Sequence, residues 1–122
     1  AGLGVTALAP IPKGAYGFYR GLKVSLNDYN PYYSWNIYPF SKVSGKPNIE
    51  KEALYGIDAT IPSKANWTRY VNCGRHDADN NIVAVQKFDK VLYKALRRVA
   101  KGEELLVDYG EDYRVTNFGW KD

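Results

Sequence analysis

Turn-forming residues interrupt the chain at short intervals and leave apolar and alternating runs that are too short for long helices. These turn clusters fall at residues 10–14, 27–31, 44–48, 62–63 and 77–81. Between them lie segments typical of strands, at residues 5–9, 15–20, 54–59, 82–88 and 104–109. The run Ile82–Val85 is β-branched and apolar enough to predict burial on both faces. The pattern therefore predicts a mostly β fold of short strands.

Two segments have helical patterns. Residues 66–71 predict a short helix in which Asn66 is the N-cap. Five apolar side chains of residues 90–101 fall on one helical face, and Asp89 and Gly102 stand where a helix would begin and end. The alternative is a strand that pairs back on residues 82–88 through a turn at 88–90. Periodicity favours the helix.

Composition excludes several kinds of site. The 122 residues include one cysteine and one histidine, so neither an internal disulfide nor a four-ligand structural zinc site can form, and we expect no metal. His76 lies in a polar loop between Arg75 and Asp77, and we expect it at the surface. No apolar run is long enough for a membrane span, so no membrane partner is predicted. The eleven tyrosines are either packing material or the groups on which the chemistry depends.

Length predicts a single domain over residues 1–122, with 114–122 as a C-terminal tail. The start at Ala1, without a methionine, suggests a domain excised from a longer chain. The net charge of +4 is unevenly placed, since residues 1–49 hold five basic side chains against Asp28 alone. Farther on, a basic stretch at 87–101 precedes an acidic group at 103–112. These clusters fit a solvated mixed surface, a face for phosphate or a rim for a basic peptide, and charge alone leaves the three open.

Four segments carry more particular patterns. They are AGLGV at 1–5, YSW at 33–35, NWTRYVNC at 66–73 and ELLVDYGEDY at 104–113. Taken singly, AGLGV fits a glycine turn, NWTRYVNC fits a packed helix end, and ELLVDYGEDY fits a strand that stops at a glycine. Taken together and in this order, they resemble the SET-domain protein lysine methyltransferases, and in particular the PR/SET branch found in PRDM proteins. The resemblance covers nearly the whole chain and is weaker over residues 37–57.

The resemblance implies a fold and a reaction. The fold is a mostly β SET fold of small curved sheets and short helices, with the C-terminal segment passing beneath a loop in a pseudoknot. This fold implies a strand over residues 91–98, where periodicity alone favours a helix. The reaction is transfer of a methyl group from S-adenosylmethionine to a lysine amine.

The resemblance also assigns roles to residues. The methyl donor is expected to contact Ala1, Gly2, Leu3, Tyr33, Asn72 and Cys73, and either Phe118 or Trp120 in the tail is expected to cover it. Tyr109 matches the catalytic tyrosine, and Tyr19 and Tyr93 match the other phenols of the lysine channel. The peptide is expected to contact these three phenols and the segment Tyr32, Tyr33, Ser34 and Trp35.

Phenols suit this chemistry because the sulfonium methyl is already activated and needs no covalent nucleophile. The lysine must lose its proton before it attacks, and desolvation in an aromatic channel lowers its pKa. Tyrosine hydroxyls can direct the amine lone pair, and their rings exclude water and accommodate a methylated cation. A carboxylate in the channel would instead hold the lysine protonated.

Two departures from the family pattern leave a second function open. Most SET domains have Asn-His-Ser where this chain has Asn72-Cys73-Gly74, and the stretch at 37–57 diverges from the family. We therefore expect either a nuclear methyltransferase that acts on a histone tail, with the basic first segment 1–49 on nucleosomal DNA, or a catalytically weak module for protein contacts. Direct nucleic-acid binding is a third option, disfavoured because no continuous basic stripe is present.

Overall fold

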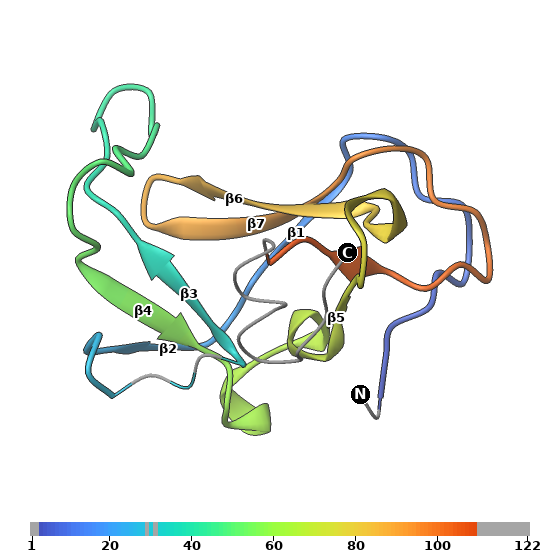
Figure 1. The fold of residues 1–122 in the computed structure, drawn as a ribbon, viewed down its shortest axis with the longest axis horizontal. Coiled ribbons are helices and arrows are strands. Elements are labelled where there is room, and N and C mark those ends of the chain that lie inside the picture. The colour runs from blue at the N-terminus through green and yellow to red at the C-terminus, as the bar shows by residue number, and fades with distance from the viewer. Residues whose placement is uncertain (1–2, 29, 31, 110–122) are drawn as a thin grey trace. The chain divides into compact units, whose positions relative to one another are not determined.

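The computed structural model describes residues 3–28, 30 and 32–109, which are short strands joined by turns and 3-10 helices (Figure 1). These residues form two compact units. The first unit takes in the described residues within 1–16, 70–84 and 93–122, and the second takes in those within 17–69 and 85–92. Helical segments of the described residues are 3-10 turns, and none is long and apolar enough to cross a membrane. The mostly β prediction is confirmed.

The first unit is organised around parallel pairing of two short strands, β5 (Asn72–Cys73) and β8 (Leu106–Val107). On its other side β8 pairs with the start of β6 (Ile82–Lys87), where Ile82 faces Val107. The full strand order of this sheet is β1-β7-β6-β8-β5, with β1 at Tyr16–Phe18 and β7 at Lys90–Ala95. Strand β8 thus separates two strands that follow one another in the sequence. Passage of the C-terminal segment beneath a loop stays a prediction.

The segment before β1 runs beside residues 99–105 without forming a strand. Backbone hydrogen bonds join Leu105 N–H to the Val5 carbonyl at 2.8 Å and Ala7 N–H to the Glu103 carbonyl at 3.0 Å. The β-bridges there are isolated ones, from Thr6 to Glu104 and from Ile11 to Val99. The predicted strand over residues 5–9 is therefore wrong. The backbone of residues 5–7, at the end of the AGLGV segment, is nevertheless hydrogen-bonded to residues 103–105.

The second unit contains an antiparallel sheet of three strands, in the order β2-β4-β3 (Figure 1). Strand β4 (Tyr55–Asp58) lies between β2 (Leu22–Val24) and β3 (Ser34–Ile37), and Asp58 is opposite Leu22 on one side and Ser34 on the other. This sheet holds the YSW segment, because Ser34 and Trp35 begin β3. Ile37, the last residue of β3, and Ala59, which follows β4, are fully buried.

Two short 3-10 helices follow this sheet, η1 (Pro62–Lys64) and η2 (Trp67–Tyr70), and a third, η3 (Asp77–Asp79), lies in the first unit. The Asn66 side chain accepts a hydrogen bond from Thr68 N–H at 3.1 Å, as a capping residue should. The expected short helix at 66–71 is thus confirmed as a 3-10 turn. Its N-cap also donates to the Phe18 carbonyl at 2.8 Å, which ties η2 to β1.

Residues 90–101 are not helical, and the prediction from periodicity is wrong. Strand β7 follows β6 through a turn at Phe88 and Asp89, where Phe88 adopts a φ of 53°. Side chains of β7 alternate, with Val91, Tyr93 and Ala95 buried. Burial of β6 on both faces is also wrong, because Val85 is 38% exposed. The strand that the family resemblance implied is confirmed over residues 90–95.

Candidate active site

Asn72 is the first polar residue of the candidate site in the first unit. Its backbone is fixed in β5 opposite Leu106 of β8, which sets the direction of its side chain. The amide nitrogen donates to the Leu3 carbonyl at 3.3 Å and to Glu104 Oε2 at 2.9 Å. The sequence assigned Leu3 and Asn72 to one donor site, and the structure brings them together.

Gly4 lies directly against this cluster. A Cβ atom at Gly4 would stand 2.6 Å from Glu104 Oε2 and 3.1 Å from Asn72 Nδ2. Contacts this short do not occur, so any side chain at position 4 would displace the carboxylate or the amide. The second glycine of the Gly2-Leu3-Gly4 motif is therefore required by the close approach of two polar side chains to its backbone.

Cys73 and Gly74 continue this segment as buried residues. The Cys73 thiol donates to the Gly74 carbonyl at 3.4 Å, so Cys73 is a small packed residue with a local partner. Gly74 N–H donates to Asn80 Oδ1 at 3.0 Å, and a Cβ at Gly74 would lie 2.2 Å from that oxygen. The other end of the Asn80 amide, Nδ2, is buried and has no hydrogen-bond partner among the described residues. A buried donor without a partner beside Gly74 is available to a ligand or a water molecule.

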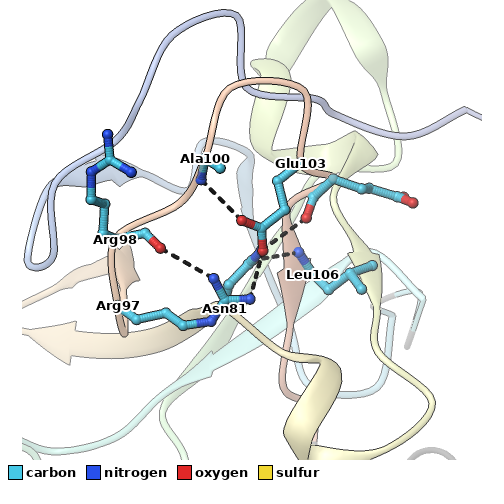
Figure 2. A network of polar contacts seen from close by, with 7 residues as sticks. Asn81, Arg97, Arg98, Ala100, Glu103 and Leu106 are labelled. Carbon is cyan, nitrogen blue, oxygen red and sulfur yellow. Dashed lines mark hydrogen bonds and ion pairs between the residues drawn. The ribbon is translucent and has the colours of Figure 1, made fainter.

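Figure 2 shows a polar network around the buried Asn81, which also involves the segment that carries Glu104. The Asn81 amide donates to the Glu104 carbonyl at 2.9 Å and accepts from Leu106 N–H at 2.8 Å. It also donates to the carboxylate of Glu103 at 3.2 Å. One side chain therefore fixes the backbone on both sides of Leu105 and holds β8 in register.

Glu103 extends this network to the surface. Its carboxylate pairs with Arg97 at 2.5 Å and accepts from Ala100 N–H at 2.9 Å. The hydrogen bond from Arg97, followed by those from Ala100 and Asn81, lowers the pKa of Glu103 to about 2. The same contact raises the pKa of the Arg97 guanidinium. Part of the acidic group at 103–112 is thus paired with the basic stretch and is not free to bind a basic peptide.

Two of the three expected channel phenols meet in the first unit. The hydroxyl oxygens of Tyr93 and Tyr109 lie 3.5 Å apart, at hydrogen-bonding distance. Tyr93 is only 1% exposed, because it points from β7 into the core between Val91 and Ala95. Tyr109 lies two residues after the end of β8 and is half-buried. A strand and a strand end that are separated by β6 in the sheet therefore bring two phenol groups to one place.

The remaining phenols lie in the second unit. The Tyr19 side chain is buried and donates a hydrogen bond to the Tyr33 carbonyl. The Arg69 guanidinium lies over the Tyr33 ring, 4.5 Å from the ring centre, in a cation–π contact. Arg69 is anchored in turn by donating to the Ala59 carbonyl at 2.8 Å and to the Thr60 carbonyl at 3.0 Å. Tyr19 and Tyr33 are thus brought together, and Arg69 is a partner that the sequence did not identify.

Asp58 organises the backbone that presents Tyr33. Its carboxylate accepts from Asn30 N–H at 2.9 Å and from Thr60 N–H at 2.7 Å, and the Asn30 carbonyl accepts from Tyr33 N–H at 3.0 Å. Burial alone would raise the pKa of Asp58, but these hydrogen bonds outweigh it, and the pKa lies below its ordinary value. The neighbouring residues expected at the peptide groove are Tyr32, which is exposed, and Ser34 and Trp35, which are half-buried in β3.

Several expected site residues lie outside the described residues, namely Ala1, Gly2, Phe118 and Trp120. Among the described residues, no three His, Cys, Asp or Glu side chains are grouped as metal ligands. The structure adds Gly4, Glu104 and Asn81 to the first unit's site. Glu104 carried a signal, since it stands in the Gly102-Glu103-Glu104-Leu105 motif, whereas nothing in the sequence pattern singled out Asn81.

The chemistry of this first-unit cluster fits a methyl donor of the adenosylmethionine type. The amide oxygen of Asn72 and the carboxylate of Glu104 are acceptors suited to an ammonium group. The unpartnered Nδ2 of Asn80 adds a donor beside Gly74. The phenol pair Tyr93 and Tyr109 offers hydroxyl groups to an amine. These atoms are the ones available to hold a donor and to position a nucleophile.

Comparison with known proteins shows the family and the fold of the chain. The family model of the PR domain of PR domain zinc finger protein 2 matches residues 1–117. The chain is 38% identical over 113 residues to PR domain zinc finger protein 2 of Homo sapiens, covering 90% of this chain and 6% of that protein. It is 32% identical over 116 residues to histone-lysine N-methyltransferase set-17 of Caenorhabditis elegans, covering 93% of this chain and 38% of that protein.

A solved structure, the methyltransferase domain of human PR domain-containing protein 2, superimposes with a TM-score of 0.69 at 37% identity. The match covers 89% of this chain and 69% of that one. The chain spans less than half the length of the two full-length relatives, so it corresponds to one region of them. The expected SET fold is confirmed by this likeness.

Proposed function

The chain belongs to the PR/SET family of SET-domain proteins, and from this premise we propose that it transfers a methyl group from S-adenosylmethionine to a lysine of a histone tail. The observation that carries the proposal is the pair of hydroxyls of Tyr93 and Tyr109, 3.5 Å apart in the first unit. The relative set-17 is named a histone-lysine N-methyltransferase, which favours a histone as the substrate. We also propose that the protein works in the nucleus, where histones are found.

The donor would be held by the segment Ala1 to Leu3, by Asn72 and Cys73, and by Tyr33, with Trp120 or Phe118 as its cover. When bound, the donor supplies a methyl group on a positively charged sulfur. The amide oxygen of Asn72 would bind its ammonium end. Buried Asn80 holds the Gly74 backbone through Oδ1, and its Nδ2 remains available to a polar group of the donor.

Tyr93 and Tyr109 would act on the lysine amine. An ammonium has no lone pair, so the lysine must release its proton before it attacks. Desolvation beside the rings of Tyr93 and Tyr109 would disfavour the charged form. The hydroxyl oxygen of Tyr109 would accept a hydrogen bond from the neutral amine and direct its lone pair towards the methyl group. Catalysis by such residues is positioning, because no covalent intermediate is required.

The peptide would lie along Tyr32, Tyr33, Ser34 and Trp35. We propose that the acidic group at 103–112 attracts the basic residues of a histone tail. The basic segment 1–49 is proposed as the surface that rests on nucleosomal DNA.

The experiment is a methylation assay on a histone peptide array with mass readout, run on the chain and on Tyr109→Phe. We expect the variant to lose at least tenfold in turnover or to change the number of methyl groups added, with the fold intact by circular dichroism. Tyr55→Phe is the matched control, because it removes a phenol hydroxyl from β4. An unchanged rate and product distribution for Tyr109→Phe would remove Tyr109 from the mechanism.

Cys73 favours a second candidate function, a module for protein contacts with weak catalysis. Its thiol is buried and hydrogen-bonded to Gly74, where most SET domains have a histidine. Calorimetry with S-adenosylhomocysteine separates the two functions. Binding in the micromolar range favours the methyltransferase, and the absence of binding at millimolar ligand favours the contact module.

A further inference from the structure

Three sequence motifs meet at the carboxylate of Glu104. Oε2 of Glu104 accepts a hydrogen bond from Asn72 Nδ2 at 2.9 Å, and it lies 2.6 Å from the position a Cβ would take on Gly4. The same Asn72 nitrogen reaches the Leu3 carbonyl at 3.3 Å. All of these contacts lie within the first unit. Glu104 is therefore the side chain that joins the glycine motif, the β5 segment and the approach to β8.

The backbone of Glu104 is held from two directions, which fixes where its side chain points. Glu104 forms the β-bridge with Thr6, and its carbonyl accepts from Asn81 Nδ2 at 2.9 Å. The next residue, Leu105, donates to the Val5 carbonyl at 2.8 Å. Successive side chains in extended backbone point to opposite faces, so Glu103 turns to Arg97 while Glu104 turns to Asn72. The two adjacent glutamates thus have different tasks.

The contact with Glu104 determines the orientation of the Asn72 amide. The two N–H groups of this amide face two acceptors, the Leu3 carbonyl and the Glu104 carboxylate. Rotation of the amide by 180° would instead set its oxygen against both acceptors, which is unfavourable. Oδ1 of Asn72 consequently points away from them, and no described residue donates to it. One fixed acceptor oxygen is left beside a carboxylate.

We propose that Glu104 is a positioning residue of the donor site, which locks the Asn72 amide so that Oδ1 accepts a hydrogen bond from the ammonium of the donor's amino-acid end. This inference rests on the proposed function. The Glu104 carboxylate adds a negative charge close to the same cation. Without Glu104, only the longer contact with the Leu3 carbonyl orients the amide of Asn72, and the acceptor is presented for a smaller part of the time.

The test is calorimetry with two ligands that differ in the amino-acid end. S-adenosylhomocysteine carries the ammonium, and 5′-methylthioadenosine lacks the whole amino-acid portion. Glu104→Ala is expected to weaken binding of S-adenosylhomocysteine about tenfold, the effect of one charge-assisted hydrogen bond, and to leave 5′-methylthioadenosine within about twofold. Glu104→Gln, which keeps an acceptor oxygen and removes the charge, should lie between Glu104→Ala and the unmodified chain. Glu50→Ala removes an exposed carboxylate in the second unit and serves as the matched control.

A second readout needs no ligand. The side-chain amide of Asn72 gives a pair of proton–nitrogen resonances, and we expect their exchange with water to quicken in Glu104→Ala and not in Glu50→Ala. Equal weakening of both ligands, or a Glu104→Ala that binds and exchanges like the control, overturns the positioning role while leaving the proposed function standing. If the unmodified chain binds neither ligand, the proposed function fails, and this inference fails with it.

Discussion

Replacing Asn81 by alanine tests whether one buried amide holds β8 in place. The side chain is 1% exposed, and it pairs with Leu106 N–H at 2.8 Å and with the Glu104 carbonyl at 2.9 Å. Asn81→Ala removes the partner of two backbone groups in partly buried hydrogen bonds, at about 1–3 kcal/mol each. We therefore expect a loss of about 3 kcal/mol from the free energy of unfolding, which is a large share of the roughly 5–15 kcal/mol typical of a domain.

Thermal unfolding followed by circular dichroism measures this loss. For 122 residues the entropy of unfolding is about 0.26 kcal/mol per kelvin, so a loss of about 3 kcal/mol lowers Tm by about 12 °C. Asn48→Ala is the control, because Asn48 is an exposed turn residue whose side chain accepts only from Glu50 N–H. The reasoning is refuted if Asn81→Ala lowers Tm by less than about 3 °C, or no more than the control does.

Three further predictions concern stability. The pKa of Glu103 is lowered from 4.5 to about 2 in the folded chain, so between these pH values the unfolded chain takes up a proton that the folded chain does not. The free energy of unfolding therefore falls as the pH is lowered through this range. Glu103→Gln removes this carboxyl group and should make that fall less steep. Acid titrations of both proteins check this, and parallel curves would contradict it. Gly21→Ala should cost more than about 2 kcal/mol, because the new Cβ would lie 2.4 Å from the Asp58 carbonyl oxygen and backbone cannot move aside cheaply. Gly17→Ala should cost less than about 1 kcal/mol although its Cβ would lie 2.7 Å from the Trp67 ring, because Trp67 is 45% exposed and its indole can turn away. Urea titrations of the two glycine variants compare them, and equal losses would show that the mobility of the neighbour is irrelevant.

Residues 90–101 show how tertiary structure overrides a local pattern. Their apolar side chains fit one face of a helix, yet β7 lies between β1 and β6 in the sheet. In the strand, Val91, Tyr93 and Ala95 point to one side and are buried, while Leu96, which the helical pattern placed in the core, is 45% exposed. Hydrogen bonds to two neighbouring strands satisfy the backbone of β7 on both sides, so pairing outweighs the weaker helical preference.

The site was predictable to the extent that its residues belong to motifs. Leu3 and Asn72 were expected at one site and are in contact, and Tyr93 and Tyr109 were expected to meet and do. Asn81 was not expected, because a buried asparagine next to a strand has the same sequence appearance as one in an exposed turn. Its role arises from pairing with Leu106, which lies 25 residues later.

The sequence by itself determined the class of fold, the order of the motifs and the supply of phenols, because turn residues, β-branched runs and tyrosines are local properties of the chain. Tertiary structure alone decided that Glu103 pairs with Arg97 while Glu104 turns to Asn72. In the sequence these two glutamates are adjacent and chemically identical. They differ only because an extended backbone, held by Thr6 on one side and Asn81 on the other, sends consecutive side chains to opposite faces.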